Sequence, residues 1–217
     1  MVTGPIWIAA IYAVSGSERR NAVTFARALC VVSGLGIVGS LGTGIGRLDA
    51  KPREFVSAAG RFRVTAPVRF TEKTEDLDLG DGLKVKMYTF LGERRGVAFI
   101  ASYIDYPAHI IDASTPDDML DGAVQGQSEQ PGARLVSADP ISLGEYPGRA
   151  VRLEADSQGQ KFTLHARSYM VGNRLYQLIT VQKLNSPQSE EVTQFLSSFQ
   201  LTEPTRAPRR SAPRVAR

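Results

Sequence analysis

The sequence has few of the residues that most often carry enzyme chemistry. Among its 217 residues there is one cysteine, Cys30, and there are two histidines, His109 and His165. One cysteine cannot form an intramolecular disulfide, so the cysteine content neither proves nor excludes an oxidising compartment. The sequence also contains no G-x-S-x-G, Walker A, H-E-x-x-H or paired-cysteine motif. These absences favour a protein that is not an enzyme and that uses no cofactor and no metal.

A glycine-rich motif does occur, but its surroundings do not suit a nucleotide-binding fold. Residues 34–39 read G-x-G-x-x-G. A dinucleotide-binding unit needs a helix next, then a second parallel strand and an acidic residue about 20 positions further on. Here more glycines follow, then a charged stretch with Pro52, and nothing beyond it alternates strand and helix. We interpret the motif as part of an apolar segment.

Charge is distributed unevenly along the chain, whose formal net charge is +4. Residues 1–51 contain five basic and two acidic residues, and residues 204–217 contain five arginines and no acid. Residues 52–203 contain 16 basic and 20 acidic residues, which gives 16 − 20 = −4. A slightly acidic body argues against nucleic acid as a partner, because nucleic-acid binding relies on clustered basic side chains.

The longest uncharged stretch lies near the N-terminus. Between Arg27 and Arg47 there are 19 uncharged residues, an apolar run over 28–46, and basic residues precede it. This length is at the threshold for a membrane span, and the preceding charges suit an N-terminus that stays in the cytoplasm. A cleaved secretory signal has the same features. Either way we expect export: an extracytoplasmic protein, membrane-anchored through this segment or secreted.

The composition therefore divides the chain into three regions. Residues 1–50 form a targeting or membrane segment, and residues 51–203 form the folded domain. Residues 204–217, rich in arginine and proline, have too little apolar content to fold and are predicted to be disordered.

The stretch 161–183 predicts a β-hairpin. Two runs rich in aromatic and β-branched residues flank Gly172-Asn173, a pair suited to a tight turn. The turn fixes the register and places Met170 opposite Leu175 on one face and Tyr169 opposite Tyr176 on the other. Further pairs follow on the two faces: Ala166 with Ile179, Leu164 with Val181, Arg167 with Leu178, and His165 with Thr180.

Other segments predict more strands and two helices. Strand patterns cover 60–67, 83–91, 97–106, 134–143 and 148–155, with a polar loop over 74–82 and a five-residue hairpin loop over 92–96. A first helix begins at Ser114-Thr115-Pro116, where a hydroxyl cap and acids suit a helix N-terminus. A second is predicted to be capped by Ser186 and begun by Pro187. Its apolar stripe is expected to pack on the face of Leu164, Ile179 and Val181, and it consists of Val192, Phe195, Leu196 and Phe199.

Strands joined by tight turns and interrupted by two helices predict an α+β fold, with an antiparallel sheet of six to eight strands flanked by helices. The order of GRFRVTAP, a hairpin, DDMLDGAVQG, ISLGEYPGRAVRLEA, YMVGNRLYQL and FLSSF resembles the PsbP-like sandwich family. The likeness covers about residues 55–201 and is nearest to uncharacterised exported bacterial members. This resemblance implies a fold shared with a Ran-GTPase release factor, and it implies no shared catalytic residues.

Two functional interpretations remain open. The first is a non-catalytic binding or accessory module whose partner is an unknown protein, an envelope component or a small ligand. Its candidate surface is the outer hairpin face, with Arg167, Tyr169, Arg174 and Tyr176, because tyrosines beside arginines suit a contact patch. The alternative for these residues is that helices cover this face and the tyrosines belong to the core.

The second interpretation is a hydrolase or transferase with an unrecognised site near His109. Five acidic residues lie around this histidine in the sequence: Asp105, Asp112, Asp117, Asp118 and Asp121. Clustered carboxylates suit Ca²⁺ or Mg²⁺, but EF-hand spacing is absent, and acids at a helix start already have an electrostatic reason to be there. We interpret the second histidine, His165, as a partly buried structural residue.

Overall fold

A computed structural model of the chain describes residues 52–79, 83–130, 132–157 and 160–202. The apolar run 28–46, Cys30 and the arginine-rich tail lie outside these residues, so the predictions made for them remain predictions.

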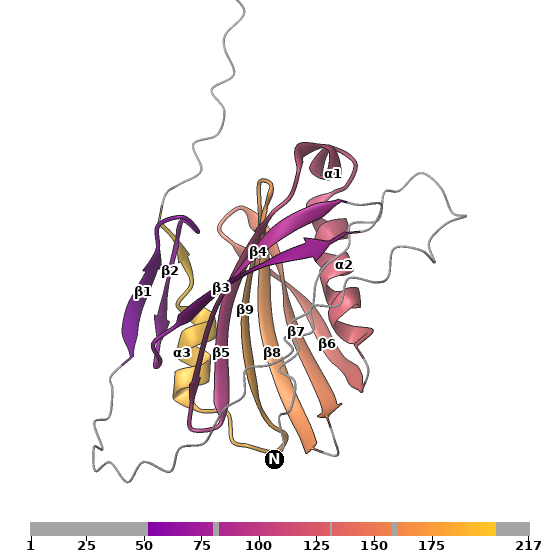
Figure 1. Cartoon of the computed structure of the whole chain (residues 1–217). Coiled ribbons are helices and arrows are strands. Elements are labelled where there is room, and N and C mark those ends of the chain that lie inside the picture. The colour runs from indigo at the N-terminus through magenta and orange to yellow at the C-terminus, as the bar shows by residue number, and fades with distance from the viewer. Residues whose placement is uncertain (1–51, 80–82, 131, 158–159, 203–217) are drawn as a thin grey trace, which may run out of the picture.

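Seven strands form the main sheet, in the order β3-β4-β5-β9-β8-β7-β6 (Figure 1). All neighbouring pairs are antiparallel. The strands are β3 (Thr71–Asp78), β4 (Lys84–Arg94), β5 (Val97–Asp105), β6 (Ala133–Leu143), β7 (Tyr146–Ser157), β8 (Gln160–Val171) and β9 (Arg174–Lys183). This confirms the predicted α+β class and the predicted six to eight strands.

A smaller sheet and three helices complete the fold. The small sheet has the order β1-β2-β10, with β1 (Arg53–Ser57), β2 (Phe62–Ala66) and β10 (Gln200–Leu201). The helices are α1 (Ala108–Asp112), α2 (Pro116–Ser128) and α3 (Glu190–Ser197). In Figure 1 the small sheet and α3 lie on one side of the main sheet, and α2 lies against β6 and β7 on the other.

Both faces of the main sheet are therefore core faces. The first core packs the sheet against α2, through residues such as Met119 and Leu120 of the helix and Ile100 and Ile179 of the strands. The second core packs the sheet against β2 and α3, and it is rich in aromatic rings. Its aromatic members are Phe62, Phe90, Phe99, Tyr103, Tyr169, Tyr176, Phe195 and Phe199.

The predicted hairpin register is confirmed. Strands β8 and β9 pair Met170 with Leu175 and Tyr169 with Tyr176, and the other four predicted pairs also occur. Gly172 has φ 61°, as the first central residue of a two-residue hairpin turn requires. The turn also contacts the end of β5, because the Asn173 side-chain amide donates to the Tyr106 carbonyl at 3.1 Å.

Two predicted loops are instead strands. The stretch 74–82 was predicted as a polar loop, yet its residues up to Asp78 belong to β3, at the edge of the sheet. An edge strand keeps one side free of a neighbouring strand, so it tolerates charged residues, and Leu77 still reaches the core. The predicted five-residue loop over 92–96 is a two-residue turn in which Arg95 and Gly96 both have positive φ, 51° and 76°.

The last helix differs from its prediction at its start and in its docking face. Ser189, and not Ser186, is the N-cap, and its hydroxyl accepts from the Val192 amide. The predicted apolar residues are indeed buried, but they belong to the aromatic core with Tyr169 and Tyr176. Ile179, on the face where the helix was expected, lies in the core under α2.

The start of α2 is confirmed and is stronger than predicted. Thr115 is the N-cap, and its hydroxyl accepts from the Asp118 amide at 3.1 Å. The Asp118 carboxylate accepts from the Thr115 amide at 3.0 Å and from its hydroxyl at 2.6 Å. Two otherwise unpaired donors at the helix end are thus satisfied reciprocally.

We expect Thr115→Ala to lower the free energy of unfolding by about 1 kcal/mol, because the helix loses its capping acceptor. Thr115→Ser keeps the hydroxyl and should stay close to the wild type. Urea denaturation of the three proteins measures the difference. Equal loss in the serine variant would show that the methyl group, and not the cap, is what matters.

The contribution of this cap to the free energy of unfolding should also depend on pH. Hydrogen bonds from the Thr115 hydroxyl and amide lower the pKa of Asp118 below its ordinary value of 3.8. The contribution of Asp118 to stability is therefore complete above about pH 4 and is lost as the pH falls through its folded-state pKa. The stability difference between the wild type and Asp118→Asn should shrink on acidification below that point. A difference that does not change with pH would contradict the cap.

Candidate functional site

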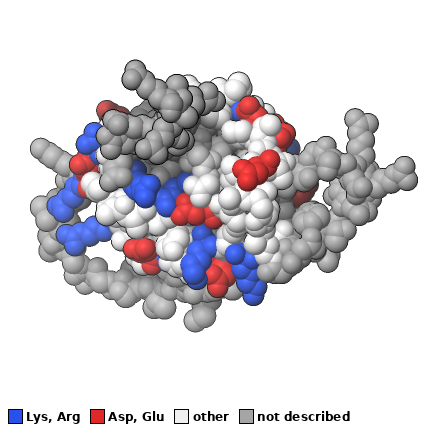
Figure 2. Space-filling model, turned by 90° about the horizontal axis from the view of Figure 1, so that it is seen from above, with Lys and Arg blue, Asp and Glu red and all other residues white. Residues whose placement is uncertain are grey.

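Figure 2 shows the molecule of Figure 1 from above. Charged side chains of both signs are mixed on this surface. No single sign dominates that view, although residues 52–203 carry a small net negative charge. Among the helices of the described residues, none is both long enough and apolar enough to cross a membrane.

The tyrosines of the predicted contact patch are buried. Tyr169 is 4% exposed and Tyr176 is 3% exposed, beneath β2 and α3. The Tyr176 hydroxyl donates to the Gly60 carbonyl at 2.7 Å, and the ring of Tyr169 stacks on Phe199 at 5.7 Å between centroids. The idea of an exposed tyrosine patch is therefore wrong, and the alternative that these tyrosines belong to the core holds. The reason is that the small sheet, whose first strand β1 lay outside the predicted elements, covers this face together with α3.

Arg174, also predicted for the contact patch, contacts three segments of the chain. Its guanidinium makes two hydrogen bonds of 2.6 Å to the Asp105 carboxylate and one of 2.9 Å to the Ala59 carbonyl. It also lies over the ring of Tyr103, 4.5 Å from the centroid. Hydrogen bonding to Asp105 raises the pKa of Arg174 further above its ordinary value. This arginine joins β9, β5 and the segment between β1 and β2.

Arg167, the fourth predicted residue, contacts the end of α3. Its guanidinium donates to the Leu196 carbonyl at 3.3 Å. Such a contact satisfies a carbonyl that a helix C-terminus leaves without an intrahelical partner. The four predicted residues thus lie at the contact between the two layers, where their interactions hold the fold together.

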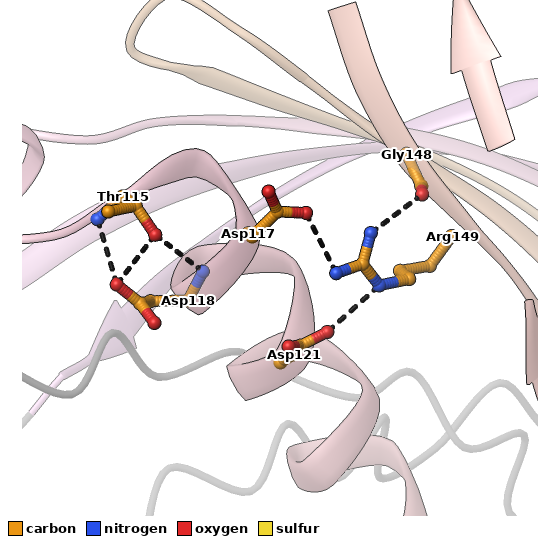
Figure 3. Close-up of polar contacts among 6 residues, drawn as sticks. All are labelled: Thr115, Asp117, Asp118, Asp121, Gly148 and Arg149. Atoms are coloured by element: carbon orange, nitrogen blue, oxygen red, sulfur yellow. Dashed lines mark hydrogen bonds and ion pairs between the residues drawn. The ribbon is translucent and has the colours of Figure 1, made fainter. Parts of the chain in front are cut away.

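The acidic region near His109 is built around a second arginine (Figure 3). Arg149 of β7 donates to Asp117 at 2.8 Å and to Asp121 at 2.9 Å, both on α2, and to the Gly148 carbonyl at 3.1 Å. Its side chain is 14% exposed. Asp118 is used in the helix cap, on the other side of the helix start in the figure.

These carboxylates therefore have structural partners. Asp105 pairs with Arg174, and Asp117 and Asp121 pair with Arg149. Within the described residues no group of three or more His, Cys, Asp or Glu side chains could hold a metal ion. His109 itself is exposed on α1.

His165 lies on the face of the sheet away from α2. It pairs with Arg152 and with Thr180 across the neighbouring strands and is half-buried. Burial, and then the positive charge of Arg152, lower the pKa of His165 below its ordinary value. It is therefore neutral at neutral pH, in keeping with the structural role predicted for it.

A different set of polar residues crosses the sheet on the face toward α2. The strand registers place these residues opposite one another in one line over neighbouring strands. We call this line the polar row: Lys73 on β3, Thr89 on β4, Ser102 on β5, Gln177 on β9, Ser168 on β8 and Arg149 on β7.

The four central members of the polar row are buried and neutral. Thr89, Ser102, Gln177 and Ser168 are 3%, 2%, 1% and 1% exposed. The Thr89 and Ser102 hydroxyl oxygens and the Gln177 amide oxygen have no hydrogen-bond partner among the described residues. The one bond within the group is long, 3.5 Å from the Gln177 amide nitrogen to the Ser168 hydroxyl. Buried polar atoms normally have a hydrogen-bond partner. The described residues supply none for these three oxygens, so each can still form a hydrogen bond to another molecule.

Sequence reasoning missed the polar row, although part of its signal was present. The hairpin register already places Ser168 opposite Gln177 on a face otherwise occupied by Ala166, Met170 and Leu175. Finding Thr89 and Ser102 beside them requires the order of β4, β5 and β9 in the sheet. That order is a tertiary property.

No protein-family model and no curated protein matches this chain. Among solved structures it is similar to cyanobacterial PsbP from Synechocystis sp. PCC 6803, with 13% identity, a TM-score of 0.48, and coverage of 76% of this chain and 99% of that one.

Two further solved structures are similar over smaller parts. A protein from Bacteroides thetaiotaomicron has 13% identity and a TM-score of 0.42, with 71% of this chain and 49% of that chain covered. The immunity protein TplEi of T6SS from Pseudomonas aeruginosa has 16% identity and a TM-score of 0.35, with 58% and 47% covered. This chain thus spans about half the length of these two proteins.

Proposed function

We propose that residues 51–203 form a non-catalytic binding module that works outside the cytoplasm, delivered or tethered by residues 1–50. The observation that carries the binding role is the polar row, in which three buried oxygens lack hydrogen-bond partners. Such atoms can recognise a ligand by hydrogen bonding. The unknown protein or envelope component predicted from the sequence would instead contact the outer surface.

The chemistry of the central polar row favours binding over catalysis. Threonine, serine and glutamine side chains do not ionise near neutral pH, so a serine there needs a general base within hydrogen-bond reach to act as a nucleophile. His165 is three residues from Ser168 on the same strand, and alternate residues of a strand point to opposite faces. The sheet therefore separates the histidine from both serines of the row.

The export part of the proposal rests on the uncharged run 28–46 and the basic residues before it. Its test is fractionation of bacterial cells that make the full-length protein, followed by mass measurement. An intact mass in the membrane fraction, or a shortened mass in the periplasm or medium, is the expected result. A full-length protein in the cytosolic fraction would contradict export. A native mass spectrum of the same fraction then tests for a bound small molecule.

We also expect the N-terminal segment to be dispensable for folding. The predicted domain begins after it, and β1 starts at Arg53, directly after Pro52. A chain that begins at Lys51 should be soluble and unfold in one cooperative transition, as followed by circular dichroism during chemical denaturation. A product that is insoluble, or that lacks a cooperative transition, would show that residues 1–50 contribute to the fold.

A further inference from the structure

The polar row lies between two apolar rows on the same face of the sheet. The first apolar row lies two residues away from the polar row along each strand and is paired in register: Met87, Ile104, Leu175 and Met170. The second apolar row lies two residues away on the other side of the polar row: Leu91, Ile100, Ile179 and Ala166. All eight belong to the core under α2 or pack against it. A molecule held along the row would meet hydrogen-bonding groups at its middle and aliphatic side chains on both sides.

Both charged ends of the polar row already have ion-pair partners. Lys73, at the β3 end, forms an ion pair with Glu75 of the same strand. Arg149, at the β7 end, is held by Asp117 and Asp121. Between them no side chain of the row carries a charge. A charged ligand would lose its hydration without gaining an opposite charge, which is strongly unfavourable in a buried site.

The free hydrogen-bonding atoms define what a ligand must offer. Each hydroxyl of Thr89 and Ser102 can donate one hydrogen bond and accept others, whereas the free oxygen of Gln177 only accepts. These residues lie on three neighbouring strands, so they span two strand spacings, about 10 Å. A matching ligand has at least one donor and one acceptor within that length.

We propose that the polar row binds a small uncharged molecule that combines hydroxyl, ester or amide groups with an aliphatic part. This inference deepens the proposed function and rests on it, because it names the binding site and the class of ligand. The ligand lies along β4, β5 and β9, with its polar groups on Thr89, Ser102 and Gln177. Its aliphatic part packs on the flanking methionine, leucine and isoleucine side chains. The three oxygens are closed to solvent, so a ligand reaches them only when the side chains packed around the row move apart.

The test uses a matched set of small probes on the full-length chain. Monobutyrin is neutral and carries two hydroxyls and an ester on a short aliphatic chain, whereas butyrate is its anionic and butylamine its cationic counterpart. Saturation-transfer NMR should detect monobutyrin, and titration should give an affinity at least about tenfold higher than for either charged probe.

The opposite face of the sheet supplies a matched control. Thr180 is fully buried and its hydroxyl also lacks a partner, but it lies on the face away from α2. Thr89→Val and Gln177→Met should each weaken monobutyrin binding about tenfold, the equivalent of one lost hydrogen bond. Thr180→Val should leave the affinity unchanged. Ser102→Ala provides a further variant of the row if one of the others does not fold.

Any other result of these experiments would contradict a specific part of the proposal. Equal binding of monobutyrin by all folded variants would reject the polar row but leave a binding module in place. Stronger binding of butyrate or butylamine would reject the neutral class. No signal from any probe would mean that only ordered water satisfies the row, and the site proposal would then be wrong. A ligand found by native mass spectrometry and unaffected by these variants would still support the proposed function.

Discussion

Phe195→Ala is expected to lower the free energy of unfolding by about 3–5 kcal/mol. Phe195 is fully buried on α3 and packs edge-on against Phe99 of the main sheet, with 5.4 Å between ring centroids. It also lies 6.3 Å from the ring of Phe70. Truncation leaves a cavity between the helix and the sheet that rigid strands cannot close. The loss is a large share of the roughly 5–15 kcal/mol that stabilises a typical domain.

Gln194→Ala is the matched control for this change. Gln194 precedes Phe195 on the same helix and its side chain is exposed, so the substitution should change stability by less than about 0.5 kcal/mol. Guanidinium denaturation of both variants and the wild type measures the difference. If the two variants behave alike, α3 does not dock on the sheet in solution.

Tyr176→Ala should be comparably destabilising, by about 3 kcal/mol or more. Its ring packs against Phe62 and Phe199, and its hydroxyl bonds to the Gly60 carbonyl at the turn before β2. The substitution removes both the packing and the hydrogen bond. It therefore weakens the attachment of the small sheet to the main sheet.

Tyr176→Phe separates the two contributions. It keeps the ring and removes only the hydroxyl, leaving the Gly60 carbonyl without this donor, which should cost about 1–2 kcal/mol. Chemical denaturation of both variants gives the two values. A loss below about 1 kcal/mol for Tyr176→Ala would mean that this face is open in solution, and the sandwich arrangement would then be wrong.

The elements that sequence reasoning described well are those specified by local chemistry. The turn residue Gly172 sets the register of β8 and β9 without help from the rest of the chain. Thr115 and Pro116 likewise specify the start of α2, because cap and first-turn preferences act over three or four residues. Such signals involve neighbours in sequence, and a single sequence contains them completely.

The errors arose where contacts between elements, and not local preferences, decide the structure. The stretch that became β3 has polar residues at most positions, so nothing local distinguishes an edge strand from a loop, and its pairing with β4 decides the matter. The start of α3 was assigned to Ser186 and Pro187, although Ser189 has equally suitable chemistry. Two candidate caps thus lay within four residues, and local chemistry does not choose between them.

The sequence by itself determined an α+β protein with a long hairpin, two of its helices and a charge pattern that concentrates basic residues at the ends of the chain. Only the tertiary structure decided which face α3 covers, because both faces of the hairpin carry large apolar or aromatic side chains and alternation ranks them equally. The tertiary structure also turned the predicted arginine and tyrosine surface into an interior contact and aligned the polar row. Both results depend on residues that are far apart in the sequence, such as Arg174 and Ala59, which are 115 positions apart and hydrogen-bonded. Local periodicity contains no information about which strands become neighbours.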